Sequence, residues 1–329
     1  MKMRILSAQD VRRALPMAEA IEGMKQAFAQ LSTGQAVVPL RGRVAVAPHS
    51  GTTLVMPAFL AQSGDLAVKV VSVFPKNSER GEPTIYAAVL VLDAANGRPL
   101  ALLEGGTLTA IRTGAGAGAA TDLLARPDAH VVAILGSGVQ ARTQLEAVCT
   151  VRDIREVRVY SPNRQNAERF AQEMRGVGPV PELMEVVDSA ETAVHHADII
   201  CAATTSSQPV FNGKDVAPGT HINGVGSYTP AMQEVDVETV QRALVVVDER
   251  AAAWEEAGDL IQPLQAGLIT EDHIYAELGE IAAGLKPGRT SPEQITFFKS
   301  VGVAVQDAIA GRIALENAVA HNLGMEATL

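Results

Sequence analysis

The spacing of apolar and polar residues changes along this chain, and the change separates two kinds of architecture. Met17, Ile21, Met24, Phe28 and Leu31 recur at helical spacing and predict a helix that ends at Gly34. From about 41 to 104 the pattern changes to that of apolar strands, such as "LAVKVVSVF" and "TIYAAVLVLD". The hairpin signal "AANGR" joins "TIYAAVLVLD" to the last of these strands, "PLALLEG". This stretch predicts a mainly antiparallel sheet.

In the rest of the chain, predicted helices and strands alternate. Residues 106 to 125 predict a helix in which Gly114, Gly116 and Gly118 leave room for a close neighbour. From His130 onward, strands such as "VVAIL", "VRVY" and "LVVVD" alternate with helices, which is typical of a parallel sheet with helices on both faces. A last helix is expected near 301–318. The 329 residues favour two domains, so we expect an α/β protein.

The segment "VVAILGSGVQAR" carries the clearest chemical signal. Gly136, Gly138 and Ala141 follow an apolar strand and open a helix, in the order G-x-G-x-x-A. The first glycine allows a tight turn, the second lets a pyrophosphate approach the backbone, and the small third residue lets helix and strand meet. The context predicts a dinucleotide site.

The next strand bears on the choice of cofactor. It ends at Ser161, where an NAD-selective site usually carries an acidic residue for the ribose hydroxyls. Ser161, Asn163 and Arg164 can instead hold a 2′-phosphate, so we expect NADPH to be preferred, with NADH possible. In the alternative interpretation Ser161 and Pro162 only begin a helix, as N-cap and first residue.

Charge and composition exclude several classes of protein. The formal charge of −10 argues against nucleic acid or an anionic membrane as partner, and no apolar run is long enough for a signal peptide or a membrane span. Cys149 and Cys201 lie in apolar segments and indicate reduced core thiols, so we expect a cytoplasmic protein. His195 and His196 are interpreted as a helix end, and no metal site is predicted.

Basic residues among apolar neighbours point to an anionic ligand. Lys69 lies within a strand, and a lysine buried there must meet an anion or lose its charge; the alternative is an exposed lysine at a sheet edge. Arg41, Arg43 and Arg112 carry guanidinium groups suited to a carboxylate. Taken singly, each can also be a surface or structural residue.

These segments together resemble the ornithine cyclodeaminase and mu-crystallin family. The resemblance rests on "VPLRGRV", "AVKVVSVFPKN", "PTIYAAVLVLD", "LTAIRTGAGAGAAT", "GSGVQAR", "AELGEIAAGLKPGRTSPEQITFFKSVG" and "AVQDAIA", in order from near residue 6 to near 318. Gly106 departs from the family's pattern before "LTAIRTG". The resemblance implies a homodimer with a Rossmann domain (121–302) and a substrate-binding and dimerisation domain (1–120 plus 303–329).

The resemblance also implies roles for particular residues. Arg41, Lys69 and Arg112 match the basic residues that hold a substrate carboxylate, and Thr84 lines the same pocket. The expected cofactor-binding residues are Arg112, Thr113, Gly136, Ser137, Gly138, Val139, Gln140, Ser161, Asn163, Arg164, Thr204 and Val225.

Ser227, in "GVGSYTPAMQE", bears on the choice of reaction. Ornithine cyclodeaminases and related alanine dehydrogenases carry an aspartate at this place, where a carboxylate can bind an ammonium and take its proton. A serine hydroxyl does neither near neutral pH. A cyclic imine acid needs no such group, because its protonated C=N bond is itself the electrophile that takes a hydride.

We therefore expect an NAD(P)H-dependent reductase of cyclic ketimine carboxylates, with the carboxylate bound by Arg41, Lys69 and Arg112. The substrates would be Δ1-pyrroline-2-carboxylate and Δ1-piperideine-2-carboxylate, reduced to L-proline and L-pipecolate. Lys69 and Ser227 are the expected catalytic residues, Lys69 as a possible proton relay and Ser227 as a hydrogen-bonding partner near the imine nitrogen. The alternatives are an ornithine cyclodeaminase or amino-acid dehydrogenase of the family, a dehydratase or opine-type enzyme, and a non-catalytic NADPH-dependent binding protein.

Overall fold

The computed structural model describes residues 2–328, apart from the side chain of Ser78. The chain forms two compact units, one from the described residues up to Arg112 and from Ala304 onward, the other from Thr113 to Val303. The first boundary falls inside helix α3 (Gly105–Leu124), whereas the sequence placed it after residue 120. None of the helices in residues 2–328 combines the length and apolar character needed to cross a bilayer.

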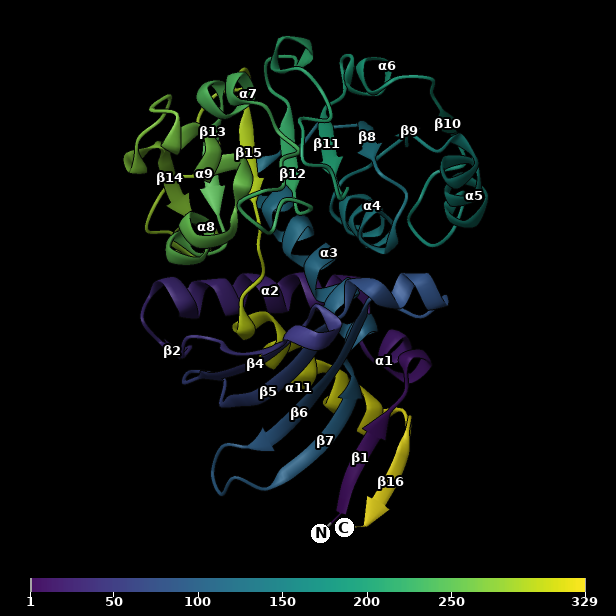
Figure 1. The fold of residues 1–329 in the computed structure, drawn as a ribbon, viewed down its shortest axis with the longest axis vertical. Helices are drawn as coiled ribbons and strands as arrows, with labels where there is room; N and C mark the ends of the chain where they lie inside the picture. Colours follow the sequence, from purple (N-terminus) through teal and green to yellow (C-terminus); the bar gives the residue numbers. More distant parts are fainter. Residues whose placement is uncertain (1, 329) are drawn as a thin grey trace. The chain divides into compact units, whose positions relative to one another are not determined.

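The first unit is built on an eight-stranded sheet in the order β16-β1-β7-β6-β5-β4-β2, with β3 also paired to β4 (Figure 1). Only the β1–β7 ladder is parallel; the others among its described strands are antiparallel. The unit's elements are β1 (Lys2–Leu6), α1 (Ala8–Ala14), α2 (Met17–Ser32), β2 (Ala36–Val37), β3 (Gly42–Val46), β4 (Gly51–Leu60), β5 (Asp65–Val73), β6 (Ile85–Asp93), β7 (Pro99–Glu104), α11 (Ala304–Ala320) and β16 (Met325–Thr328).

Alternation along β5 separates the two faces of this sheet. Helix α11 packs against β4, β5 and β6 and against α2 (Figure 1). Ala67 and Lys69 are buried on the covered face, whereas Val70 on the opposite face is 41% exposed. The predicted lysine within an apolar strand is therefore a buried residue, and the sheet-edge alternative is wrong.

The second unit contains an eight-stranded sheet in the order β10-β9-β8-β11-β12-β15-β13-β14, and every ladder in it is parallel. The predicted α/β fold, with one parallel and one mainly antiparallel sheet, is confirmed. The elements are β8 (Val131–Leu135), α4 (Val139–Val151), β9 (Glu156–Tyr160), α5 (Arg164–Met174), β10 (Met184–Val186), α6 (Ala190–Val194), β11 (Ile199–Ala202), β12 (His221–Gly224), α7 (Val237–Arg242), β13 (Leu244–Val247), α8 (Arg250–Glu256), α9 (Gly258–Gln265), β14 (Ile274–Glu277), α10 (Leu278–Ala282) and β15 (Thr296–Lys299).

Each face of this parallel sheet has its own apolar core. In β8, Val132 and Ile134 belong to the cluster that includes residues of α4 and α5, whereas Ala133 and Leu135 belong to the cluster that includes residues of α7 and α9. Cys149 is one of the buried residues, and burial raises the pKa of its thiol to about 12. The continuous apolar runs seen in the sequence therefore reflect strands buried on both faces.

Candidate active site

Three charged side chains from distant parts of the sequence meet inside the first unit. Lys69 lies on β5, Arg112 on α3 and Asp307 on α11, and all three are buried. Lys69 Nζ lies 3.1 Å from Asp307 Oδ1, and Arg112 Nε lies 3.2 Å from the same oxygen. Because two cations share one carboxylate, the three groups carry a net positive charge. Such a buried cluster suits a small carboxylate ligand.

The surroundings of Lys69 change its acidity. Burial is the main reason that the pKa of Lys69 falls from 10.5 to about 8; Asp307 opposes this fall, while Arg112 and Arg41 add to it. The charge of Arg41 acts on Lys69, so the structure brings together Arg41, Lys69 and Arg112, three of the five predicted substrate residues, and leaves out Thr84 and Ser227. A lysine with this pKa keeps its proton at neutral pH and can release it at modest cost.

Asp307 and Gln306 were not predicted as site residues. Arg112 Nη1 donates to Gln306 Oε1 at 2.9 Å, so two neighbouring residues of α11 hold the guanidinium. Both lie in "VAVQDAIAG", where two polar residues interrupt an apolar helix that is buried on several sides. That interruption is the only signal the sequence offers, and it does not reveal the partner.

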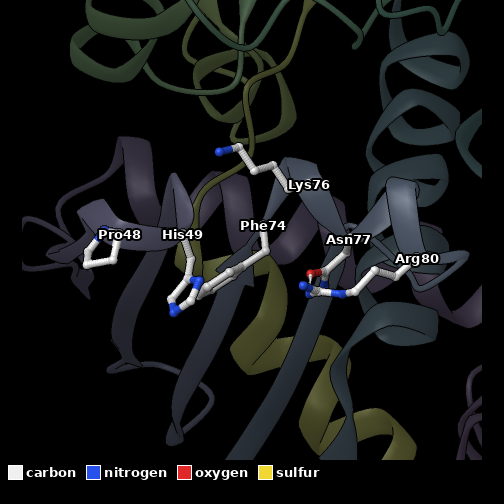
Figure 2. Close-up of a pocket in the computed structure, with 6 residues that line it drawn as sticks. All are labelled: Pro48, His49, Phe74, Lys76, Asn77 and Arg80. Carbon is white, nitrogen blue, oxygen red and sulfur yellow. Dashed lines mark hydrogen bonds between the residues drawn. The ribbon is translucent and has the colours of Figure 1, made fainter.

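The fourth predicted residue, Thr84, lies on the surface after a loop that borders a pocket. The carbonyl oxygen of Thr84 accepts a hydrogen bond from Phe74 N at 2.8 Å. The pocket has a volume of about 440 Å³ and is lined by Pro48, His49, Phe74, Lys76, Asn77 and Arg80 (Figure 2). Asn77 Oδ1 accepts from Arg80 Nη2 at 2.7 Å. The lining is basic, but among the described residues it includes none of the five predicted substrate residues.

The loop between β8 and α4 has the geometry needed to receive a pyrophosphate. Gly136 has a φ of +110°, and a Cβ there would lie 2.5 Å from the carbonyl oxygen of Ala203. Gly138 is the N-cap residue of α4, and a Cβ built on it meets nothing within 4 Å. The loop follows β8, the strand at which the order of the sheet reverses. The first amides of α4 are thus open to an anion.

Other predicted cofactor residues lie beside this loop. Ser137 Oγ lies 3.3 Å from Ser161 Oγ, and this contact joins the segments that follow β8 and β9. Val139 is 62% exposed at the start of α4, and Gln140 Oε1 is buried with no hydrogen-bond partner among the described residues. Thr113 is mostly buried in α3. An orphaned oxygen and an open helix end fit a bound dinucleotide.

The capping alternative for Ser161 is wrong. Helix α5 begins at Arg164, and its N-cap is Asn163, whose side-chain oxygen accepts from Asn166 N at 3.2 Å. Arg164 Nε donates to Glu168 Oε1 at 3.0 Å, and Arg164 also pairs with Asp188. Asn163 therefore has a structural task, and Arg164 is already held by two exposed carboxylates.

Thr204 and Val225 follow β11 and β12 at the carboxyl edge of the parallel sheet. Val225 N donates to Ala202 O at 3.1 Å, which joins the two strand ends. Thr204 N and Gly226 N both donate to the carboxylate of Glu234. A Cβ at Gly226 would lie 2.2 Å from the carbonyl oxygen of Thr204, so this close approach requires glycine.

Ser227 is fully buried, and its hydroxyl is already engaged. Its Oγ donates to the carbonyl oxygen of Met232 at 2.9 Å and accepts from Asp259 N at 3.1 Å. Only one lone pair of the hydroxyl is left, so in this arrangement Ser227 can accept a hydrogen bond from a ligand but has no proton to donate. Its role towards the imine stays a prediction.

Comparison with known proteins shows similarity to one family over nearly the full length of the chain. Residues 1–322 match the model of the ornithine cyclodeaminase/mu-crystallin family. A Δ1-pyrroline-2-carboxylate reductase of Bacillus cereus is 42% identical over 323 residues, which cover 98% of each chain.

Two solved structures are also similar over nearly the whole chain. The Δ1-pyrroline-2-carboxylate reductase of Thermococcus litoralis, in complex with NADH and L-proline, is 46% identical with a TM-score of 0.93, covering 98% of this chain and 99% of that one. An archaeal alanine dehydrogenase dimer with bound NAD is 34% identical with a TM-score of 0.92, covering 100% of both. This chain belongs to the ornithine cyclodeaminase/mu-crystallin family.

Proposed function

We propose that this protein is an oxidoreductase that reduces cyclic ketimine carboxylates with NAD(P)H. The substrates would be Δ1-pyrroline-2-carboxylate, giving L-proline, and Δ1-piperideine-2-carboxylate, giving L-pipecolate. The observation that carries the proposal is the buried pair of Lys69 and Arg112 on a single oxygen of Asp307. Two relatives with this full-length similarity are Δ1-pyrroline-2-carboxylate reductases.

The residues of the first unit would bind the carboxylate and hold a proton. Arg112 and Arg41 would supply guanidinium donors, and Lys69 would add its ammonium. Substrate binding adds an anion and so offsets the excess positive charge of the cluster. With a pKa of about 8, Lys69 can keep a proton at neutral pH and exchange it during a reaction.

The glycine loop of the second unit would hold the dinucleotide. Gly136, Ser137, Gly138, Val139 and Gln140 would face the pyrophosphate, with Thr204 and Val225 contributing from the two neighbouring strand ends. The bound nicotinamide supplies the hydride that reduces the C=N carbon. The protein's own task is to keep the space at Gly138 and the first amides of α4 open until the phosphates bind.

A preference for NADPH would depend on Arg164. Its two ion pairs are exposed, since the side chains of Glu168 and Asp188 are 55% and 90% accessible, so a 2′-phosphate can replace them at little cost. Arg164→Ala should lower kcat/KM for NADPH about tenfold and leave kcat/KM for NADH unchanged. Arg169→Ala, on the same helix, is the control. Equal loss for both cofactors would remove Arg164 from 2′-phosphate recognition.

A homodimer would form through the uncovered face of the first unit's sheet. Val44, Val55, Val70 and Tyr86 lie on this face and are 37% to 58% exposed, and Val55 is directly paired with Val70. One relative is a dimer. Val70→Glu should give a monomer in light scattering after size exclusion, whereas Val177→Glu, at a valine of the second unit that is 53% exposed, should not. If the Val70→Glu protein is still a dimer, the interface lies on another surface.

The free thiols of Cys149 and Cys201 agree with a reducing compartment, and the cytoplasm remains the proposed location.

The reaction is tested with a matrix of both reduced cofactors against the two cyclic imines and against pyruvate with ammonia or methylamine. Oxidised cofactors with L-alanine and L-ornithine complete the set, since one relative is an alanine dehydrogenase. We expect the highest kcat/KM with the imines. Faster turnover of an acyclic amino acid would overturn the proposal in favour of a dehydrogenase or deaminase, and cofactor binding without turnover would favour a binding protein.

A further inference from the structure

Glu234 is a fully buried carboxylate in the second unit that the proposed chemistry leaves without a task. Its Oε1 accepts a hydrogen bond from Thr204 N at 2.5 Å, and its Oε2 accepts one from Gly226 N at 2.6 Å. Thr204 follows β11 and Gly226 follows β12. A single side chain thus joins the two segments that leave the carboxyl ends of neighbouring parallel strands.

The Thr204 segment is packed against the glycine loop, and the Gly226 segment is packed against Thr204. The Cβ position of Gly136 lies 2.5 Å from Ala203 O and 3.3 Å from the Thr204 methyl carbon, and that of Gly226 lies 2.2 Å from Thr204 O. No side chain fits between these backbones, so the segments approach one another directly at both glycines. Glu234 therefore contacts Thr204, and the segment that contains Thr204 contacts the loop at Gly136.

Glu234 is itself fixed by a second buried carboxylate. Asp259 Oδ1 accepts from Glu234 N at 2.7 Å and from Val235 N at 3.0 Å, and Asp259 Oδ2 lies 3.2 Å from Lys299 Nζ. Asp259 and Lys299 are both fully buried. Lys299 lies at the end of β15, in register with Gly224 of β12. The cluster holds two carboxylates for one ammonium, a costly arrangement in a protein interior. The pKa of Glu234 is raised, mainly by burial.

We infer that Glu234 is a positioning residue for the dinucleotide, which sets the spacing of the Thr204 and Gly226 segments beside the glycine loop. This inference rests on the nucleotide site proposed above. Glu234 does not touch the cofactor in this role. It accepts the partly buried N–H group of Thr204 and the buried one of Gly226, and thereby keeps both segments at one fixed distance.

Glutamine is the sharpest replacement, because it keeps the size of the side chain. Its carbonyl oxygen can accept one of the two N–H groups, but its NH₂ group then faces the other N–H, donor against donor. One of the two segments must move away. Aspartate keeps the charge beside Lys299 but is one methylene shorter, so it can reach only one segment.

The experiment compares Glu234→Gln and Glu234→Asp with the wild type and with Asp198→Asn. Asp198 is a matched control in the same unit: its Oδ2 also accepts two backbone N–H groups, from His130 at 2.9 Å and Val131 at 3.0 Å, but where β8 begins. The measurements are the NADH dissociation constant by fluorescence titration, thermal unfolding without nucleotide, and amide hydrogen exchange at Thr204 and Gly226.

We expect Glu234→Gln to weaken NADH binding about tenfold or more, which corresponds to about 1.4 kcal/mol. Exchange should speed up at Thr204 or Gly226, and Glu234→Asp should show a smaller loss of affinity. Asp198→Asn should lower the unfolding temperature but leave NADH affinity unchanged. Wild-type affinity in both Glu234 variants, or an equal loss in Asp198→Asn, would overturn the positioning role while leaving the proposed function intact. If the wild type binds neither NADH nor NADPH, both proposals fall.

Discussion

Replacing Asp307 with asparagine tests the charge cluster more directly than replacing either cation. In the folded protein Asp307 Oδ1 is shared by Lys69 and Arg112, and all three side chains are 7% exposed or less. Asparagine has nearly the same shape and keeps an oxygen that can accept both hydrogen bonds. The substitution therefore removes one negative charge and puts an NH₂ group in place of Oδ2, which is buried and has no hydrogen-bond partner among the described residues.

The expected cost follows from that loss of charge. Removing one partner of a buried ion pair destabilises proteins by about 3–5 kcal/mol, and the retained hydrogen bonds favour the lower end, so we expect a loss of about 3 kcal/mol at pH 7. Asp307 holds the pKa of Lys69 up, so the pKa of Lys69 falls further in the variant. Once the pH exceeds about 8, Lys69 is neutral in both folded proteins, and its share of the difference disappears. The destabilisation should therefore shrink as the pH rises towards about 8 and stay constant above it.

Urea unfolding between pH 6 and pH 9 measures both effects, with Asp65→Asn as the control. Asp65 is another buried carboxylate of the first unit, paired with Arg312 at 2.7 Å, but burial raises its pKa, so its charged form is disfavoured in the folded state. Its replacement should therefore destabilise the protein less than Asp307→Asn does. If Asp307→Asn is as stable as the wild type at pH 7, or if its deficit grows with pH, the charge account of this cluster is wrong.

Three further predictions concern single positions. Because the pKa of Lys69 is about 8, kcat/KM for the imine should fall above that pH as the ammonium is lost, and Lys69→Arg should remove this alkaline limb; an unchanged limb would assign it to another group. Ser227→Asp should be at least about 2 kcal/mol less stable in urea unfolding than Ser227→Ala, because both variants lose the donor to Met232 O but only aspartate adds a charge to a fully buried site; equal stability would contradict this. Gly136→Ala should destabilise the protein without nucleotide, because its φ is +110° and the new Cβ meets Ala203 O, whereas Gly138→Ala should spare the thermal stability and weaken only NADH binding; the reverse order would refute the loop geometry.

Local pattern in the sequence was sufficient for the type of fold and for locating one of the two candidate ligand sites. Alternation with period two predicted the strands of the first unit, and the order of strands and helices predicted the parallel sheet. The G-x-G-x-x-A turn could be located because its conformation depends on a few consecutive residues. β14 and β15 were not predicted: each has four residues and only a short apolar run, whereas the equally short β13 is apolar throughout.

Tertiary structure alone decided what the charged residues meet. Lys69 and Asp307 are separated by 238 positions, and no local pattern links a lysine in a strand to an aspartate in the last helix. The same holds for Glu234, whose partners lie 30 positions before it and 8 positions before it. Secondary structure follows from neighbours in sequence, but burial and charge pairing follow from neighbours in space. The sequence could therefore name Lys69, Arg112 and Ser227 as candidates, while only the folded chain determined which of them have a proton, a charge or a lone pair left for a ligand.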